Sequence, residues 1–96
     1  MITFVVYMRV LPENAQAYEA VFAAMREKVF TNEPGAIHYA LSKSADDPTR
    51  YMAIEVYRDE AALAAHAGAD YLKSAMAITA PLVGAEDYDC QRYEGV

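Results

Sequence analysis

Residues 51–82 read YMAIEVYRDEAALAAHAGADYLKSAMAITAPL. The first part, residues 51–58, alternates in period two, which predicts a β-strand. One set of alternating residues is more apolar than the other, namely Met52, Ile54 and Val56 against Tyr51, Ala53, Glu55 and Tyr57. Asp59 is a candidate N-cap for the helical pattern over 60–82, which Gly68 interrupts. This stretch therefore predicts a strand followed by a broken helix.

The remaining elements follow outward from this stretch. Residues 2–11 are apolar and rich in β-branched and aromatic side chains, which predicts a first strand. A one-sided apolar stripe over 14–30 predicts a helix that Asn14 caps, and alternation over 36–44 predicts a second strand. Residues 86–93 predict the last strand. The order β-α-β-β-α-β indicates one α+β domain over 1–96, with a ferredoxin-like four-stranded antiparallel sheet and both helices on one face.

The two faces of the predicted sheet differ in whether the chain itself can cover them. Alternate residues of a strand face opposite sides of the sheet, and we assign the more apolar set of each strand, its inward parity, to the face under the helices. The residues of this set are Ile2, Phe4, Val6, Met8, Val10, Ile37, Tyr39, Leu41, Met52, Ile54, Val56, Tyr88 and Cys90. The opposite face carries tyrosines and a valine, and no element remains to cover it. A symmetric homodimer packed sheet to sheet is the simplest cover. The alternative is a monomer whose sheet meets water on one side.

Composition excludes several classes of function. The 96 residues include 8 basic and 14 acidic side chains, a formal net charge of −6, which argues against a nucleic-acid partner. No apolar run is long enough for a membrane span, and the N-terminus lacks a signal-peptide pattern. A single cysteine, Cys90, and two distant histidines predict no disulfide and no metal site. The expected location is cytoplasmic.

His66 and Tyr71 are the first candidates for chemistry. Small alanines surround His66 in the helical segment, so a cavity can lie beside its imidazole, which moves protons near neutral pH. Tyr71 can reach the same space and hold a substrate oxygen. A helix histidine bonded to a backbone carbonyl or exposed to water, and a core tyrosine, are the structural alternatives, and both remain open at this point.

Glu55 and His38 are weaker candidates. A carboxylate at Glu55, in the middle of a strand, is costly unless it is paired. By parity Glu55 falls on the partner-facing side, where an ion pair with Arg9 is favoured over a catalytic acid. His38 shares that side, where an interface role is favoured over catalysis.

The stretch 55–66 (EVYRDEAALAAH), followed by DYL at 70–72, resembles the antibiotic biosynthesis monooxygenase (ABM) family of dimeric α/β-barrel proteins. Residues 32–35 (NEPG) and the opening strand fit the same pattern, so the resemblance covers nearly the whole chain. It implies a homodimer whose sheets form a barrel, and a pocket between sheet and helices in each protomer. The pocket-wall candidates that it implies are Val6, Phe22, Tyr39, Met52, Ile54 and Met76.

The resemblance also implies a chemistry. Some members of the family oxidise phenolic or polyketide rings to quinones with O₂ and without a cofactor. The substrate is deprotonated to an electron-rich anion that reacts with oxygen. In this chain His66 would be the base or hydrogen-bond partner, and Tyr71 would hold a substrate oxygen.

Other branches differ at the site. The haem-degrading branch relies on an Asn, a Trp and a haem-ligating His, where this chain holds Val6, His66 and Met76, so haem degradation is disfavoured. An isomerase of a phosphorylated sugar-derived carbonyl compound, of the phospho-autoinducer-2 type, is an alternative that would use His66 to shuttle protons. Its phosphate would need basic residues, with Lys43, Arg50 and Lys73 as candidates. A binding dimer without turnover is the third hypothesis.

Overall fold

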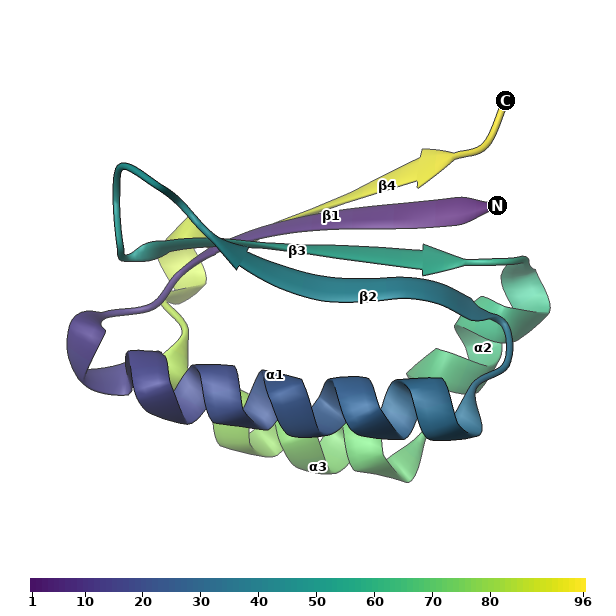
Figure 1. The fold of residues 1–96 in the computed structure, drawn as a ribbon, viewed down its shortest axis with the longest axis horizontal. Coiled ribbons are helices and arrows are strands. Elements are labelled where there is room, and N and C mark those ends of the chain that lie inside the picture. Colours follow the sequence, from purple (N-terminus) through teal and green to yellow (C-terminus); the bar gives the residue numbers. More distant parts are fainter.

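The computed structural model describes residues 1–96 as one sheet with helices below it (Figure 1). In chain order the elements are β1 (Ile2–Arg9), α1 (Pro12–Asn32), β2 (Ala36–Lys43), β3 (Arg50–Tyr57), α2 (Glu60–Ala67), α3 (Asp70–Thr79) and β4 (Asp89–Glu94). Two short 3₁₀ turns, Ala80–Leu82 and Ala85–Asp87, connect α3 to β4. The strand order is β2-β3-β1-β4 and all pairs are antiparallel. The predicted ferredoxin-like α+β fold is confirmed.

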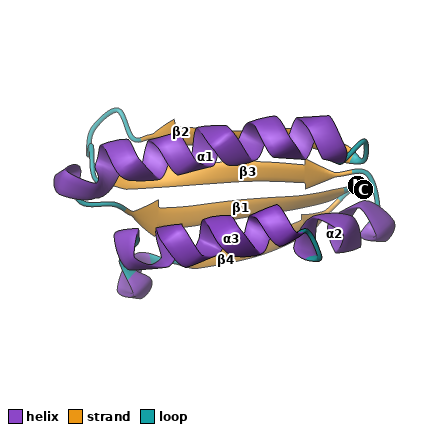
Figure 2. Cartoon of the chain, turned by 90° about the horizontal axis from the view of Figure 1, so that it is seen from below, coloured by secondary structure: helices purple, strands orange, loops and turns teal.

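All helices lie on one face of the sheet. Viewed from the helix side, α1 lies over β2 and β3, and α3 lies over β1 and β4, and both helices run roughly along the strands (Figure 2). The other face has no covering element. None of the helices combines the length and the apolar character that crossing a lipid bilayer requires.

Of the two predicted N-cap residues, Asp59 and Asn14, only Asp59 caps a helix. Asp59 caps α2, because its side chain accepts a hydrogen bond from the backbone N–H of Ala62 at 2.8 Å. The cap predicted at Asn14 is wrong. Helix α1 begins two residues earlier at Pro12, whose fixed φ and missing N–H suit the first helical position.

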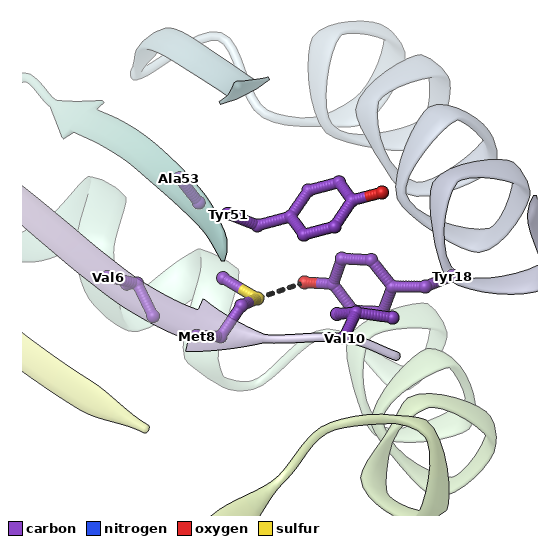
Figure 3. Close-up of a cluster of buried hydrophobic side chains, with 6 residues drawn as sticks. All are labelled: Val6, Met8, Val10, Tyr18, Tyr51 and Ala53. Atoms are coloured by element: carbon purple, nitrogen blue, oxygen red, sulfur yellow. Dashed lines mark hydrogen bonds between the residues drawn. The ribbon is translucent and has the colours of Figure 1, made fainter. Parts of the chain in front are cut away.

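The core lies between β1, β3 and α1. Six buried side chains form its main cluster, Val6, Met8, Val10, Tyr18, Tyr51 and Ala53. The Tyr18 hydroxyl donates to the sulfur of Met8 inside this cluster (Figure 3). The hydroxyl of Tyr51 reaches the Glu19 carboxylate at the rim. Both tyrosines can therefore be buried without leaving a polar group unpaired.

Strand β3 faces the opposite way from the parity prediction. It pairs with β1 so that Ala53 lies opposite Val6 and Glu55 opposite Phe4, which puts both β3 residues under the helices. Met52 and Ile54 consequently lie on the other face, and they are not pocket residues. The error arose because both faces of this strand are apolar, so hydrophobicity does not fix its direction.

The sheet face away from the helices is named the open face here. Its residues follow from the strand register and are Thr3, Val5, Tyr7, Arg9, His38, Ala40, Ser42, Arg50, Met52, Ile54, Val56, Asp89, Gln91 and Tyr93. The reversal of β3 brings Met52, Ile54 and Val56 to its centre, beside Val5. The open face is therefore more apolar than the sequence alone predicted.

Candidate active site

A cavity of about 560 Å³ lies between the sheet and the helices. It is lined by 22 residues, of which all but Glu55, His66 and Thr79 are hydrophobic. Met76 and Tyr88 line it and are more than half exposed, so the cavity meets solvent beside them. This shape suits a largely apolar small molecule with one polar end.

Most of the residues proposed for the site lie at this cavity. Val6, Phe22, Tyr39, His66 and Met76 all line it. His38 does not, because it is exposed on the open face.

The imidazole of His66 is held by a carboxylate that the sequence analysis did not single out. Glu33 follows the end of α1, and its Oε1 and Oε2 atoms lie 3.0 and 3.1 Å from Nδ1 of His66. Both residues are only 6% exposed. A carboxylate accepts but cannot donate, so Nδ1 carries the hydrogen and the orientation of the ring is fixed.

A close approach of two segments makes this contact. A Cβ atom placed on Gly35 would lie 2.4 Å from the Cβ of Ala62, so the turn after α1 packs directly against α2. The turn holds Glu33, and α2 carries His66 one turn beyond Ala62. Small residues on both sides therefore bring the carboxylate to the imidazole.

Tyr71 supports the same carboxylate and does not face the cavity. Its hydroxyl donates to Oε2 of Glu33, and Tyr71 is not among the lining residues. Burial, followed by the hydrogen bond and charge of Glu33, raises the pKa of Tyr71 to about 12. The hydroxyl therefore stays protonated at neutral pH. Its single hydrogen is engaged with Glu33, so it is not free to donate to a substrate oxygen as expected.

Glu55 lies under the helices, on the cavity wall. Its Oε1 accepts a 2.6 Å hydrogen bond from the Tyr57 hydroxyl and lies 3.9 Å from Nε2 of His66. The expected ion pair with Arg9 is wrong, because Arg9 faces the other way and its Nε donates to Asp87 at 3.0 Å. Glu55 therefore lines the cavity and does not belong to the open face.

Among the cavity residues that are not exposed, three polar atoms have no hydrogen-bond partner in the chain. They are Nε2 of His66, Oε2 of Glu55 and the hydroxyl of Tyr39, and no fully buried polar side-chain atom lacks a partner. These atoms are therefore accessible from the cavity. Burial, followed by the charge of Glu55, raises the pKa of Tyr39 well above its usual range, so its hydroxyl remains a donor. The candidate site thus offers an imidazole nitrogen, a carboxylate acceptor and a hydroxyl donor.

Glu33 was missed because its partner lies far away in the chain. It stands in a stretch that indicates a helix stop, and 33 residues separate it from His66. One signal was available. A carboxylate at the C-terminal end of a helix is unfavourable toward the helix dipole, so a compensating partner is expected.

Comparison with known proteins decides the family. The sequence profile of the family described as antibiotic biosynthesis monooxygenase matches residues 1–78, most of the chain. The chain belongs to the antibiotic biosynthesis monooxygenase family. No match was found among curated proteins.

Solved structures agree with the ABM family assignment. A Caulobacter crescentus protein, provisionally named an antibiotic biosynthesis monooxygenase, is 34% identical, with a TM-score of 0.91 over 99% of this chain and 89% of its own. A Nitrosomonas europaea protein with the same provisional name is 27% identical, with a TM-score of 0.84 over 100% of this chain and 99% of its own. A conserved Methanosarcina mazei protein, at 21% identity and a TM-score of 0.88 over 99% and 92%, shares the fold.

Proposed function

We propose that this ABM protein is a cofactor-independent monooxygenase that oxidises a small aromatic or polyketide-like substrate with O₂. The observation that carries the proposal is the His66 imidazole, held at Nδ1 by Glu33 while Nε2 is free at an apolar cavity. A histidine fixed in this tautomer has its basic nitrogen aimed at the ligand space. Membership of the ABM family supports the reaction class.

The first step is removal of a substrate proton. Nε2 of His66 takes a proton from an acidic C–H or O–H group, and the imidazolium that forms is stabilised by Glu33 at Nδ1. The Tyr39 hydroxyl is free to donate to the oxygen on which negative charge develops. The carbanion or phenolate that results is electron-rich.

The second step consumes oxygen. The anion gives one electron to O₂, and the two radicals combine into a C–O–O⁻ group, to which His66 returns its proton. The hydroperoxide then loses water, as its O–O bond and the remaining C–H bond break and a C=O bond forms. A CH₂ group and O₂ thus become a carbonyl and H₂O. The apolar walls exclude water from the reactive anion.

We also propose that the protein is a homodimer formed through the open face. Val5, Met52, Ile54 and Val56 lie on it half-buried, and Tyr7 and Tyr93 are about half exposed. A contiguous apolar patch of this kind usually marks an interface. A second copy packed sheet to sheet would cover it.

The charges near the cavity argue against a phosphorylated substrate. No lysine or arginine lines the cavity. Lys43 pairs with Glu19 at 3.1 Å and Arg50 with Asp47 at 3.3 Å. Two of the three residues named as phosphate partners are therefore engaged with carboxylates elsewhere.

The test is oxygen uptake with 2-hydroxyanthrone, a three-ring ketone with an acidic CH₂ group and a free hydroxyl, measured above the buffer rate. We expect uptake by the wild type, and a loss of about 100-fold or more in a His66→Ala variant. His38→Ala is the matched control, because His38 is exposed on the other sheet face. Product formed equally well without oxygen would favour an isomerase, and binding without turnover would favour the binding dimer.

A further inference from the structure

We infer that Glu55 and Tyr39 set the substrate specificity of the cavity, selecting an uncharged molecule whose hydroxyl donates to Glu55 and rejecting anions. The inference deepens the proposed function and rests on it only in taking the cavity as the substrate site.

The Glu55 carboxylate is fixed, and one of its oxygens is free. Oε1 accepts from the Tyr57 hydroxyl at 2.6 Å, and Tyr57 is fully buried. Burial, followed by the charge of Glu55, raises the pKa of Tyr57 far above its usual range, so it always donates. Oε2 has no partner and borders the cavity. A carboxylate oxygen in this position requires a hydrogen-bond donor from the ligand.

The Tyr39 hydroxyl complements this acceptor. Its ring stacks on Phe22, with centroids 4.9 Å apart and planes at 17°, and its centroid lies 5.5 Å from that of His66. The ring is therefore held in place while the hydroxyl stays unpaired. Tyr39 lies opposite Glu55 in the register of β2 and β3. A ligand hydroxyl both donates, as Glu55 requires, and accepts, as Tyr39 requires, whereas a carboxylate or an ether cannot donate.

The charges around the cavity disfavour anions. Glu33 and Glu55 lie on the two sides of the His66 ring, and no cationic side chain lines the walls. A ligand carboxylate beside Oε2 of Glu55 would put two like charges together in a partly desolvated site. A neutral hydroxyl of the same size would pair with this oxygen instead. The same carboxylate therefore attracts one ligand and repels the other.

The experiment compares three naphthalenes that share one ring system, 2-naphthol, 2-naphthoate and 2-methoxynaphthalene. Their dissociation constants are measured at pH 7 without oxygen, by titration calorimetry, for the wild type, Glu55→Gln and the control Glu27→Gln. The amide oxygen that Glu55→Gln introduces can still accept from Tyr57, and Glu27 is exposed on α1.

For the wild type and Glu27→Gln, naphthol should bind about 100-fold tighter than naphthoate and about tenfold tighter than the methoxy compound. Glu55→Gln should reduce the preference over naphthoate at least about tenfold. Equal binding of the three probes, binding of none, or a preference that Glu55→Gln leaves unchanged would overturn the inference. Because no turnover is measured, absence of oxygen uptake would refute only the proposed reaction.

Discussion

Nδ1 of His66 lies 3.0 Å from Oε1 of Glu33, although the two residues are 33 positions apart. Glu33 follows the end of α1, and His66 lies in the last turn of α2. The contact joins the turn after α1 to the middle of the site. It fixes the direction of the imidazole, and Tyr71 fixes Glu33 in turn. The orientation of the imidazole at the cavity therefore depends on a carboxylate that does not line the cavity.

A Glu33→Gln variant tests whether Glu33 fixes the tautomer and the position of His66. In Glu33→Gln the amide nitrogen can donate to Nδ1, which favours the tautomer with its hydrogen on Nε2. We expect kcat for 2-hydroxyanthrone to fall by about 10- to 100-fold with little change in KM, because Glu33 does not line the cavity. Nitrogen NMR of the imidazole should show the hydrogen on Nδ1 in the wild type and on Nε2 in the variant.

The control for this experiment is Glu27→Gln, on the exposed side of α1, the helix that Glu33 follows. It should keep the wild-type kcat and the wild-type NMR signature. A Glu33→Gln variant with full kcat and an unchanged tautomer would show that the contact does not position His66.

Alkaline pH should weaken the link between Tyr71 and Glu33. The pKa of Tyr71 is raised to about 12, so the folded state favours the protonated phenol. The stability that this hydroxyl contributes is fully present below the ordinary tyrosine pKa of about 10 and is lost as the pH rises toward 12. Urea unfolding followed by circular dichroism should show the wild type more stable than Tyr71→Phe at pH 8. The difference should shrink at pH 11, and an unchanged difference would contradict the assignment.

A methyl group at Gly35 should disturb both stability and the site. Its Cβ would lie 2.4 Å from the Cβ of Ala62, which cannot rotate away, so α2 must shift. We expect Gly35→Ala to lower the free energy of unfolding by about 1–3 kcal/mol. Gly84→Ala is the control, because the nearest atoms to its Cβ lie 3.9 Å away, and its effect should stay within about 0.5 kcal/mol. Urea unfolding of both variants measures the contrast, and equal effects would contradict this packing.

A charge on the open face should dissociate the proposed dimer. Ile54 lies at the centre of this face, opposite Val5 of β1 and Ala40 of β2. In sedimentation experiments at micromolar concentration we expect the wild type to be a dimer and Ile54→Lys a monomer. Ile78→Lys, on the exposed side of α3, should remain a dimer. A wild-type monomer would refute the proposal.

The order of the elements was predictable because each change of hydrophobic period is bounded by turn or capping residues. The direction of β3 was not, because Tyr51, Ala53 and Tyr57 are as suitable for burial as Met52, Ile54 and Val56. Tyrosines can enter the core when their hydroxyls find partners, as that of Tyr57 does at Glu55. The register of β3 with β1 decides which face of β3 lies under the helices, and this register cannot be derived from a single sequence.

The candidate site was predictable only at its centre. Helical spacing and the surrounding alanines indicated His66, which lines the cavity. Glu33 and the inward position of Glu55 depend on contacts between distant segments, namely the turn after α1 against α2, and β3 against β1. The role expected for Tyr71 changed for the same reason, because its hydroxyl donates to Glu33 and Tyr71 does not line the cavity.

The most direct test of the central claim, that His66 is the base in an oxidation by O₂, is the fate of isotopically labelled oxygen. 2-Hydroxyanthrone is incubated with ¹⁸O₂ and the wild type, His66→Ala or buffer, and the early product is examined by mass spectrometry. The claim predicts one ¹⁸O atom in the new carbonyl, formed far faster with the wild type than with His66→Ala or buffer. Equal rates of label incorporation for the wild type and His66→Ala would contradict it.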